Sequence, residues 1–410
     1  MAGGYGRPPL KKGAAMLGTT LAILSLAAML AATTGGAGSA ADGRTAPRSD
    51  STGAVRMGEF FVGGHYVADG TAMAGQAHVL YLLPSDRKYA IPVVMIPGLG
   101  QTISNFITTP DGRPGWAQKL VALGFAVYLM DQPGRGASGY NRTVYGPSSG
   151  QTPLLLEQRF TAPERFTPEP GKPWGWPQAR YHRQWPGTGM PGDPAFDQFY
   201  ASQVESPSGN LSSDLVKDAG VALLDRIGPA VVVTHSQAGA FGWRIGDARP
   251  DKVLAMVAIE PSGPPFFSAP PPWGDGDPDK LSRPYGLTRE PLAYSPALPD
   301  PAALAPVEDG AADRPDLARC WRQGGPARKL ANLSRFPVLI LTSQASYHAG
   351  YDHCTARYLE QAGVKTDFIR LADRGITGNG HMMMLEKNSD VIAALFGKWI
   401  RANVTKEGVR

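Results

Sequence analysis

The chain has 410 residues and a formal charge of +5, and removing the three basic residues of its first 41 residues leaves about +2. So weak a charge gives no support to a nucleic-acid partner. The sequence has no CxxC pair, no HExxH motif and no histidine tract, so we expect neither a metal site nor a cofactor.

The first 41 residues have the pattern of a secretory signal peptide. Basic residues precede an apolar run at 14–32, and small residues follow it. The run is also close to the length that spans a membrane, so a retained anchor is the alternative. We therefore expect a secreted or periplasmic protein, for which a membrane is a partner only if this segment is retained. A polar linker at 42–55 leads into a folded domain at 56–404.

Apolar runs and the residues that end them predict the elements of this domain. Short strands come first, at 59–62 and 78–83. An alternation follows, with strands at 91–96, 126–131, 231–233, 253–260, 337–342 and 366–371 and helices at 116–123, 211–227, 237–247, 354–363 and up to residue 399. Because such alternation is typical of parallel sheets with helices on both faces, we expect an α/β fold with a doubly wound, mostly parallel sheet.

Two segments interrupt the alternation, at about 140–210 and 261–326. Both are rich in proline and glycine, and the first is also rich in aromatic residues. A long irregular segment inside a compact domain is usually a functional lid or a binding loop. We expect both to be insertions, and we expect Trp185 and His182 of the first one to line a pocket.

The two cysteines, Cys320 and Cys354, are expected to form a disulfide if the chain is exported. Closing a loop of this length stabilises a protein by about 3 to 4 kcal/mol in the chain-entropy model. Two buried free thiols are the alternative.

The apolar strand at 231–233 ends abruptly in Ser236, which the helix at 237–247 follows. A serine at a sharp turn between a buried strand and a helix displays its hydroxyl at the carboxyl edge of the sheet. The G-x-S-x-G pattern of such turns is met loosely, because Thr234 and Ala238 replace the glycines. An ordinary helix start with a serine cap is the alternative. The serine also argues against dehalogenase or epoxide hydrolase chemistry, which needs an aspartate here.

A base and an acid are expected at the same edge of the sheet. His381 follows the last strand at a loop-length distance, which suits the base of a serine hydrolase. Asp352 follows the strand at 337–342 and is one candidate for the acid. Glu260 ends the strand at 253–260 and is the other, since a carboxylate there needs a partner if it is buried.

Three strings together resemble the α/β-hydrolase superfamily. They are HSQAG at 235–239, EP at 260–261 and GNGHMMM at 378–384. Within the superfamily, they are similar to a small group of exported bacterial esterases with a Ser-Glu-His triad. The similarity covers most of the chain after about residue 55 and implies an α/β-hydrolase fold with lid insertions.

Carried over residue by residue, the resemblance implies a catalytic role for several positions. Ser236 becomes the nucleophile, His381 the base and Glu260 the acid that orients the imidazole. The backbone amides of Leu99 and Gln237 form the oxyanion hole.

The sequence therefore predicts an exported carboxylic-ester hydrolase that acts through an acyl-enzyme on Ser236. The expected substrate is a small-molecule or polymeric ester. An amidase or an acyltransferase on the same triad is the first alternative. A binding protein with this fold and no catalytic activity is the second.

Overall fold

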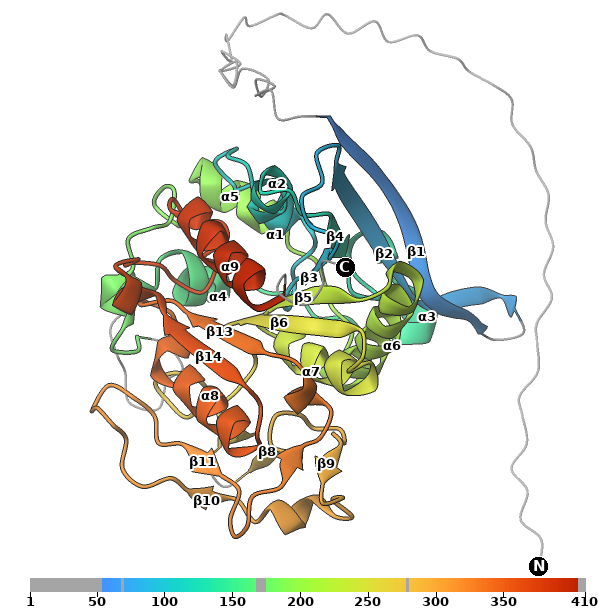
Figure 1. Ribbon diagram of the computed structural model, residues 1–410. Helices are drawn as coiled ribbons and strands as arrows, with labels where there is room; N and C mark the ends of the chain where they lie inside the picture. The colour runs from blue at the N-terminus through green and yellow to red at the C-terminus, as the bar shows by residue number, and fades with distance from the viewer. Residues whose placement is uncertain (1–53, 68–69, 167–174, 278–279, 405–410) are drawn as a thin grey trace, which may run out of the picture. The chain divides into compact units, whose positions relative to one another are not determined.

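The computed structural model describes residues 54–67, 70–166, 175–277 and 280–404 (Figure 1). The predicted signal peptide at 1–41 and nearly all of the predicted linker lie outside these ranges, so both stay predictions. Within the described ranges, no helix has both the length and the apolar character that a membrane span requires.

An eight-stranded sheet forms the centre of the domain (Figure 1). Its strands are ordered β1-β2-β4-β3-β5-β6-β13-β14, and those from β4 to β14 are parallel. The bounds are β1 Val55–Val67, β2 Ala72–Pro84, β3 Val93–Ile96, β4 Val127–Met130, β5 Ala230–His235, β6 Val253–Ile259, β13 Val338–Thr342 and β14 Thr366–Arg370. The predicted mostly parallel α/β sheet is confirmed.

Helices cover both faces of the sheet. Those packed against its strands are α2 Trp116–Ala122, α6 Gly209–Ile227, α7 Ala238–Ala248, α8 Asp352–Gln361 and α9 Ser389–Val404. Alternate residues of β5 point into two separate cores. Val231 and Val233 pack in a cluster with residues of α2 and α9, whereas Val232 packs in a cluster with residues of α6, α7 and α8. Burial on both faces explains why the parallel strands read as unbroken apolar runs.

The first two strands are longer than the sequence predicts. β1 and β2 pair antiparallel along their whole lengths, from Val55 opposite Pro84 to Val67 opposite Ala72. Val55 therefore belongs to a strand and not to the linker. Much of β1 is exposed, so backbone pairing extends it well beyond the apolar residues that signal a strand.

The 140–210 segment contains short helices where the sequence predicts none. Proline stands in the first turn of α4, η4 and α5, where its missing N–H costs nothing. The elements are α3 Arg142–Tyr145, α4 Pro153–Leu156, the π-helix η3 Glu157–Thr161, the 3₁₀-helices η4 Pro163–Arg165 and η5 Ala179–Tyr181, and α5 Pro194–Ala201. Each helix spans only one or two turns, too few for a helical period to show in the sequence.

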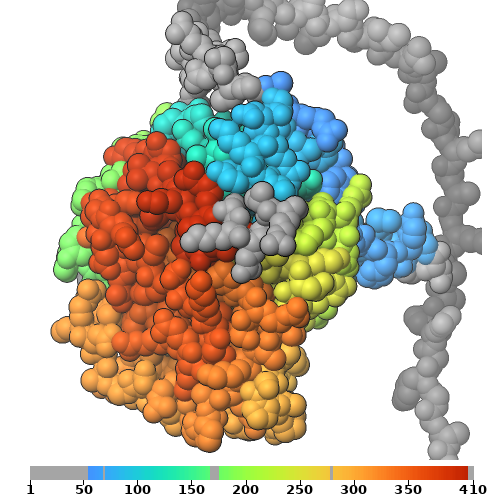
Figure 2. All heavy atoms as spheres, viewed as in Figure 1, coloured from blue at the N-terminus to red at the C-terminus, as the bar shows by residue number. Residues whose placement is uncertain are grey.

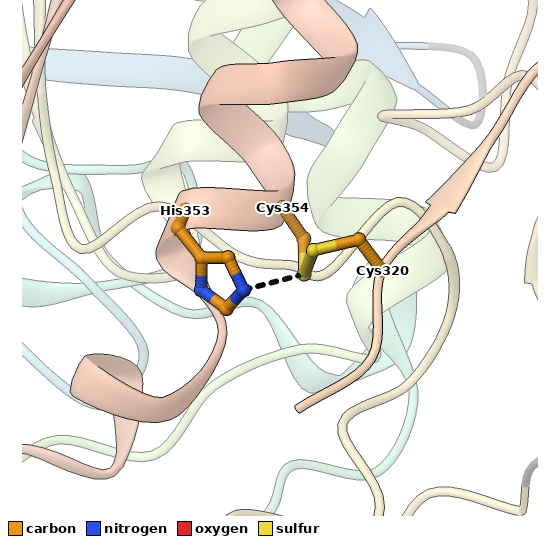
Figure 3. Close-up of side chains that lie close together, drawn as sticks. All are labelled: Cys320, His353 and Cys354. Atoms are coloured by element: carbon orange, nitrogen blue, oxygen red, sulfur yellow. Dashed lines mark hydrogen bonds between the residues drawn. A yellow bond between two sulfur atoms is a disulfide. The ribbon is translucent and has the colours of Figure 1, made fainter. Parts of the chain in front are cut away.

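The 261–326 segment is largely irregular, and most of its regular elements are strands of two or three residues. They are β7 Phe266–Phe267 with β8 Leu281–Arg283, β10 Val307–Glu308 with β11 Trp321–Arg322, and β9 Tyr294–Ser295 with β12 Lys329–Leu330 just beyond the segment. A disulfide joins Cys320 to Cys354 of α8 (Figure 3). In Figure 2 the light orange surface of this segment lies beside the darker orange surface of the part of the chain that follows it. The bond therefore fastens this irregular segment to the sheet domain.

The remaining short elements lie in connections. They are α1 Ser104–Ile107, η2 Gly136–Ser138, η6 Pro301–Leu304, η7 Leu333–Arg335, η8 Tyr347–Gly350 and η9 Leu371–Arg374.

Candidate active site

Ser236 lies at the sharp turn between β5 and α7. Its φ of 55° is in the left-handed region, which a residue other than glycine rarely adopts. Its carbonyl accepts hydrogen bonds from the amides of Gly239 and Ser262, at 2.9 Å each, and its own amide donates to the carbonyl of Ile259 at 3.0 Å. Three backbone bonds thus keep a strained residue in place, as at the nucleophile turn of a serine hydrolase.

Glycines elsewhere provide the close approach that this turn needs. A Cβ on Gly98 would lie 2.9 Å from Cβ of Ser236, so only glycine fits beside the serine. A Cβ on Gly242 would lie 2.8 Å from Cγ2 of Thr234. Gly242, one turn along α7, therefore makes room for the threonine that replaces a glycine of the usual motif.

Glu260 and His381 form a direct pair. Nδ1 of His381 donates to Oε2 of Glu260 at 2.5 Å, and both side chains are buried. Glu260 follows β6 directly and has a φ of 43°, again in the left-handed region. The residues that the sequence predicts as base and acid, 121 positions apart, therefore meet at the carboxyl edge of the sheet.

Serines from the loop after β13 surround the carboxylate of Glu260. Oε1 accepts the amide of Ser343 at 2.8 Å and its hydroxyl at 2.5 Å, and Oε2 accepts the hydroxyl of Ser346 at 2.7 Å. Burial raises the pKa of Glu260, whereas nearby His348 and these hydrogen bonds oppose the rise. The donors therefore favour the charged form in a site that has lost its water.

Four rings surround His381. His235, His348 and Tyr347 lie 4.5, 4.8 and 4.9 Å from it between ring centres, and Phe160 stacks on it at 5.3 Å. Burial lowers the pKa of His381 well below its ordinary value, and His348 lowers it further. Nε2 of His381 has no hydrogen-bond partner among the described residues. The ring is therefore neutral and can accept a proton at Nε2.

His235 has its own partner, as expected for a residue next to Ser236 whose side chain points elsewhere. Its Nε2 donates to the carbonyl of His381 at 3.1 Å, so it supports the loop that carries His381.

The alternative acid, Asp352, pairs with a different histidine. It begins α8, is fully buried, and accepts from Nδ1 of His348 at 2.8 Å and from Oγ1 of Thr342 at 2.6 Å. Burial and the charge of Glu260 raise the pKa of Asp352 well above its ordinary value. Sequence reasoning left His348 outside the site. It lies on η8 and not on α8, so no helical spacing linked it to Asp352.

The residues expected in the oxyanion hole lie around a buried arginine. Nη1 of Arg135 donates to the carbonyl of Gly98 at 2.9 Å, and Nη2 donates to Oε1 of Gln237 at 2.8 Å. Leu99 follows Gly98 directly, and its side chain is partly exposed. Arg135 therefore ties the turn before Leu99 to the residue after Ser236. No local pattern in the sequence predicts this contact.

The two predicted pocket residues are both buried. Trp185 packs edge-on against Phe199, with 5.3 Å between ring centres. The ring of His182 lies between the carboxylates of Glu164 and Glu386. Their role in a substrate pocket stays a prediction.

Two buried clusters have the composition of a metal site. Cys320, His353 and Cys354 form the first, but their sulfur atoms are joined in the disulfide (Figure 3). The second contains Glu260, His348 and His381, in which Glu260 already accepts a hydrogen bond from His381. We assign a metal to neither cluster, because these internal bonds already use the ligand atoms.

Comparison with known proteins identifies the family of the chain. A model of the Alpha/beta hydrolase family matches residues 93–395. A protein named probable secreted lipase phiG, from a fungal species (strain ATCC 74256), is 42% identical over 361 residues, which cover 87% of this chain and 92% of the relative.

A solved structure described as a novel bacterial esterase has a similar fold. It superposes with a TM-score of 0.54 at 20% identity, and the match covers 85% of this chain and 96% of the esterase. This likeness bears on the fold alone. On the match of the family model and the identity to the lipase, the chain belongs to the alpha/beta hydrolase family and is a carboxylesterase-like ester hydrolase.

Proposed function

We propose that the chain is an exported serine hydrolase that cleaves carboxylic esters through an acyl-enzyme on Ser236. The observation that carries the proposal is the bond of 2.5 Å between His381 and Glu260, at the same sheet edge as the strained turn of Ser236. This arrangement has the three parts of a nucleophile, base and acid in the chain order Ser-Glu-His.

Proton transfer starts the reaction. Nε2 of His381 removes the proton from Oγ of Ser236 as the oxygen attacks the ester carbonyl. Glu260 accepts from Nδ1 and stabilises the imidazolium that forms. The same proton then passes to the leaving alcohol, and a water molecule activated by His381 hydrolyses the acyl-enzyme.

The negative charge on the carbonyl oxygen needs donors in place before the reaction. The amides of Leu99 and Gln237 are our candidates. Arg135 supports this assignment because it links the carbonyl of Gly98 to the side chain of Gln237. One donor in such a hole lowers the barrier by about 3 to 4 kcal/mol.

The relative that is named a secreted lipase supports both an ester substrate and export. The signal-peptide pattern of the first 41 residues agrees with export. We therefore propose carboxylic esters of small molecules or polymers as the substrate class.

Hydrolysis of p-nitrophenyl butyrate by the purified protein tests the proposal. We expect the variant Ser236→Ala to lose kcat by about 10⁴-fold or more while it keeps the thermal stability of the wild type. The matching p-nitroanilide, run in parallel, measures the preference for esters over amides. Undiminished ester turnover in the variant would remove Ser236 as the nucleophile.

A further inference from the structure

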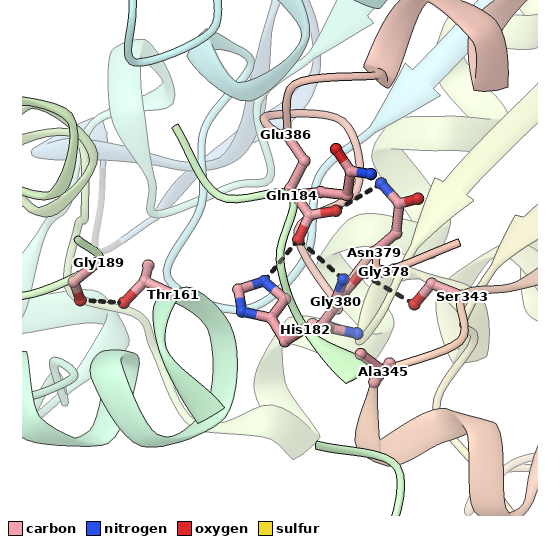
Figure 4. Close-up of polar contacts among 12 residues, drawn as sticks. Thr161, His182, Gln184, Gly189, Ser343, Ala345, Gly378, Asn379, Gly380 and Glu386 are labelled. Atoms are coloured by element: carbon pink, nitrogen blue, oxygen red, sulfur yellow. Dashed lines mark hydrogen bonds and ion pairs between the residues drawn. The ribbon is translucent and has the colours of Figure 1, made fainter. Parts of the chain in front are cut away.

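The loop that carries His381 lies against a short stretch of the 140–210 segment (Figure 4). The amide of Arg183 donates to the carbonyl of Gly378 at 2.9 Å, and the amide of Lys387 donates to the carbonyl of Gln184 at 2.8 Å. Nε2 of Gln184 donates to the carbonyl of Thr377 at 2.9 Å. The stretch is thus hydrogen-bonded to the loop both before His381, at Thr377 and Gly378, and after it, at Lys387.

A histidine with two carboxylate partners lies at the centre of these contacts. Nδ1 of His182 is 2.7 Å from Oε2 of Glu164. Its Nε2 is 2.9 Å from Oε1 of Glu386, the contact that Figure 4 shows. The side chains of His182 and Glu386 are 1% and 0% exposed, whereas that of Glu164 is 34% exposed. Only the charged imidazolium can donate from both nitrogens at once. Two carboxylate partners at hydrogen-bond distance therefore favour a protonated His182.

Glu386 also accepts hydrogen bonds from the two residues that precede His381. The oxygen that accepts from His182 also accepts the amide of Gly380 at 2.8 Å, and the other oxygen accepts Nδ2 of Asn379 at 2.6 Å. Oγ of Ser343 lies 2.9 Å from the carbonyl of Gly380 and 2.5 Å from Oε1 of Glu260, so its single hydrogen is shared between the two acceptors. The ring of His182 is therefore linked through one carboxylate to the backbone that positions the base.

We propose that His182 is a positioning residue for His381: clamped as an imidazolium between Glu164 and Glu386, it holds the backbone beside the base in its productive place. The inference rests on the proposed role of His381 in ester hydrolysis. It also assigns the 140–210 segment a role in positioning the proposed catalytic base.

The charged groups around His182 come from several elements. The two acidic groups are Glu164 on η4 and Glu386, which follows the His381 loop. Two arginines lie nearby. Arg113 donates to the carbonyls of Glu386 and Lys387, and Arg183 donates to Oγ1 of Thr377. Burial lowers the pKa of His182, but the two carboxylates outweigh burial and raise it to about 9. The clamp is therefore intact at neutral pH and loses one N–H donor above about pH 9, where we expect kcat to fall.

The variant Glu164→Gln tests the role of His182 and leaves the buried side chains of His182 and Glu386 unchanged. Removing one negative charge lowers the pKa of His182, so the alkaline fall in kcat with p-nitrophenyl butyrate should move down by about one pH unit. The plateau kcat below pH 7 should stay within about twofold. Glu59→Gln is the matched control, since Glu59 is the exposed partner of another buried histidine, His78. Its pH profile should overlay that of the wild type.

A second variant, His182→Gln, keeps a donor near Glu386 but cannot carry charge. We expect kcat to fall about tenfold with KM within twofold, and the alkaline fall to disappear. An alkaline fall that stays at the wild-type pH in Glu164→Gln would overturn the inference if turnover requires Ser236. Turnover that survives Ser236→Ala would instead overturn the proposed function on which it rests.

Discussion

Two buried histidine–carboxylate pairs lie side by side at the carboxyl edge of this sheet. His381 bonds to Glu260 at 2.5 Å, and His348 bonds to Asp352 at 2.8 Å. The two imidazole rings are stacked 4.8 Å apart and within 9° of parallel. By distance and burial alone, either pair could serve as the base and acid of a triad.

The surroundings of the two carboxylates differ. Glu260 accepts from Ser343, Ser346 and His381, whereas Asp352 accepts from Thr342 and His348. Two carboxylates this close in a dry site do not both ionise easily. The extra donors favour charge on Glu260, and that charge in turn raises the pKa of Asp352. We therefore propose that hydrogen-bond donors, more than distance, decide which carboxylate supports catalysis.

The largest expected difference is between Glu260→Gln and Asp352→Asn. The first variant loses the charge that stabilises the imidazolium, so we expect kcat to fall by about 10³-fold to 10⁴-fold. The second replaces a carboxyl whose raised pKa disfavours its charged form, so we expect less than a tenfold loss. Steady-state kinetics on p-nitrophenyl butyrate measure both, and a reversed order of the two losses would transfer the role of acid to Asp352.

Ser346→Ala should have an intermediate effect. It removes the hydroxyl that donates at 2.7 Å to the same oxygen that accepts from His381. Because hydrogen bonds to charged groups contribute about 1.5 to 3 kcal/mol, we expect roughly a tenfold or larger loss in kcat. Wild-type kcat in this variant would mean that the hydroxyl does not favour the charged form of Glu260.

The pH dependence gives the smallest but most specific effect. Burial and His348 lower the pKa of His381, so the acid limb of kcat/KM should lie below pH 6.5 in the wild type. In His348→Gln the pKa of His381 should rise, which moves the acid limb to higher pH with a plateau within about threefold. If the limb stays in place, the stacked ring does not influence the base.

The parallel sheet and the order of its strands along the chain were predictable because each buried parallel strand has a short, continuous run of apolar residues. Val231 to Val233 is such a run, and it is buried on both faces. The antiparallel β1 was harder to delimit, since most of its residues are exposed and Gly63 and Gly64 interrupt it.

The residues of the proposed triad could be predicted from the sequence because each follows a strand. Their supporting residues were not, since those contacts depend on packing between distant segments. His182 and Glu386 are 204 positions apart, and Arg135 and Gln237 are 102 apart. No local pattern encodes either contact.

Trapping the acyl-enzyme tests the central claim most directly. The wild-type protein is mixed with p-nitrophenyl butyrate, quenched with acid within the first turnover, digested and analysed by mass spectrometry. We expect a butyryl group on the peptide that contains Ser236, and its absence in the Ser236→Ala variant. Rapid ester turnover with no adduct, or with an adduct on another residue, would contradict the account.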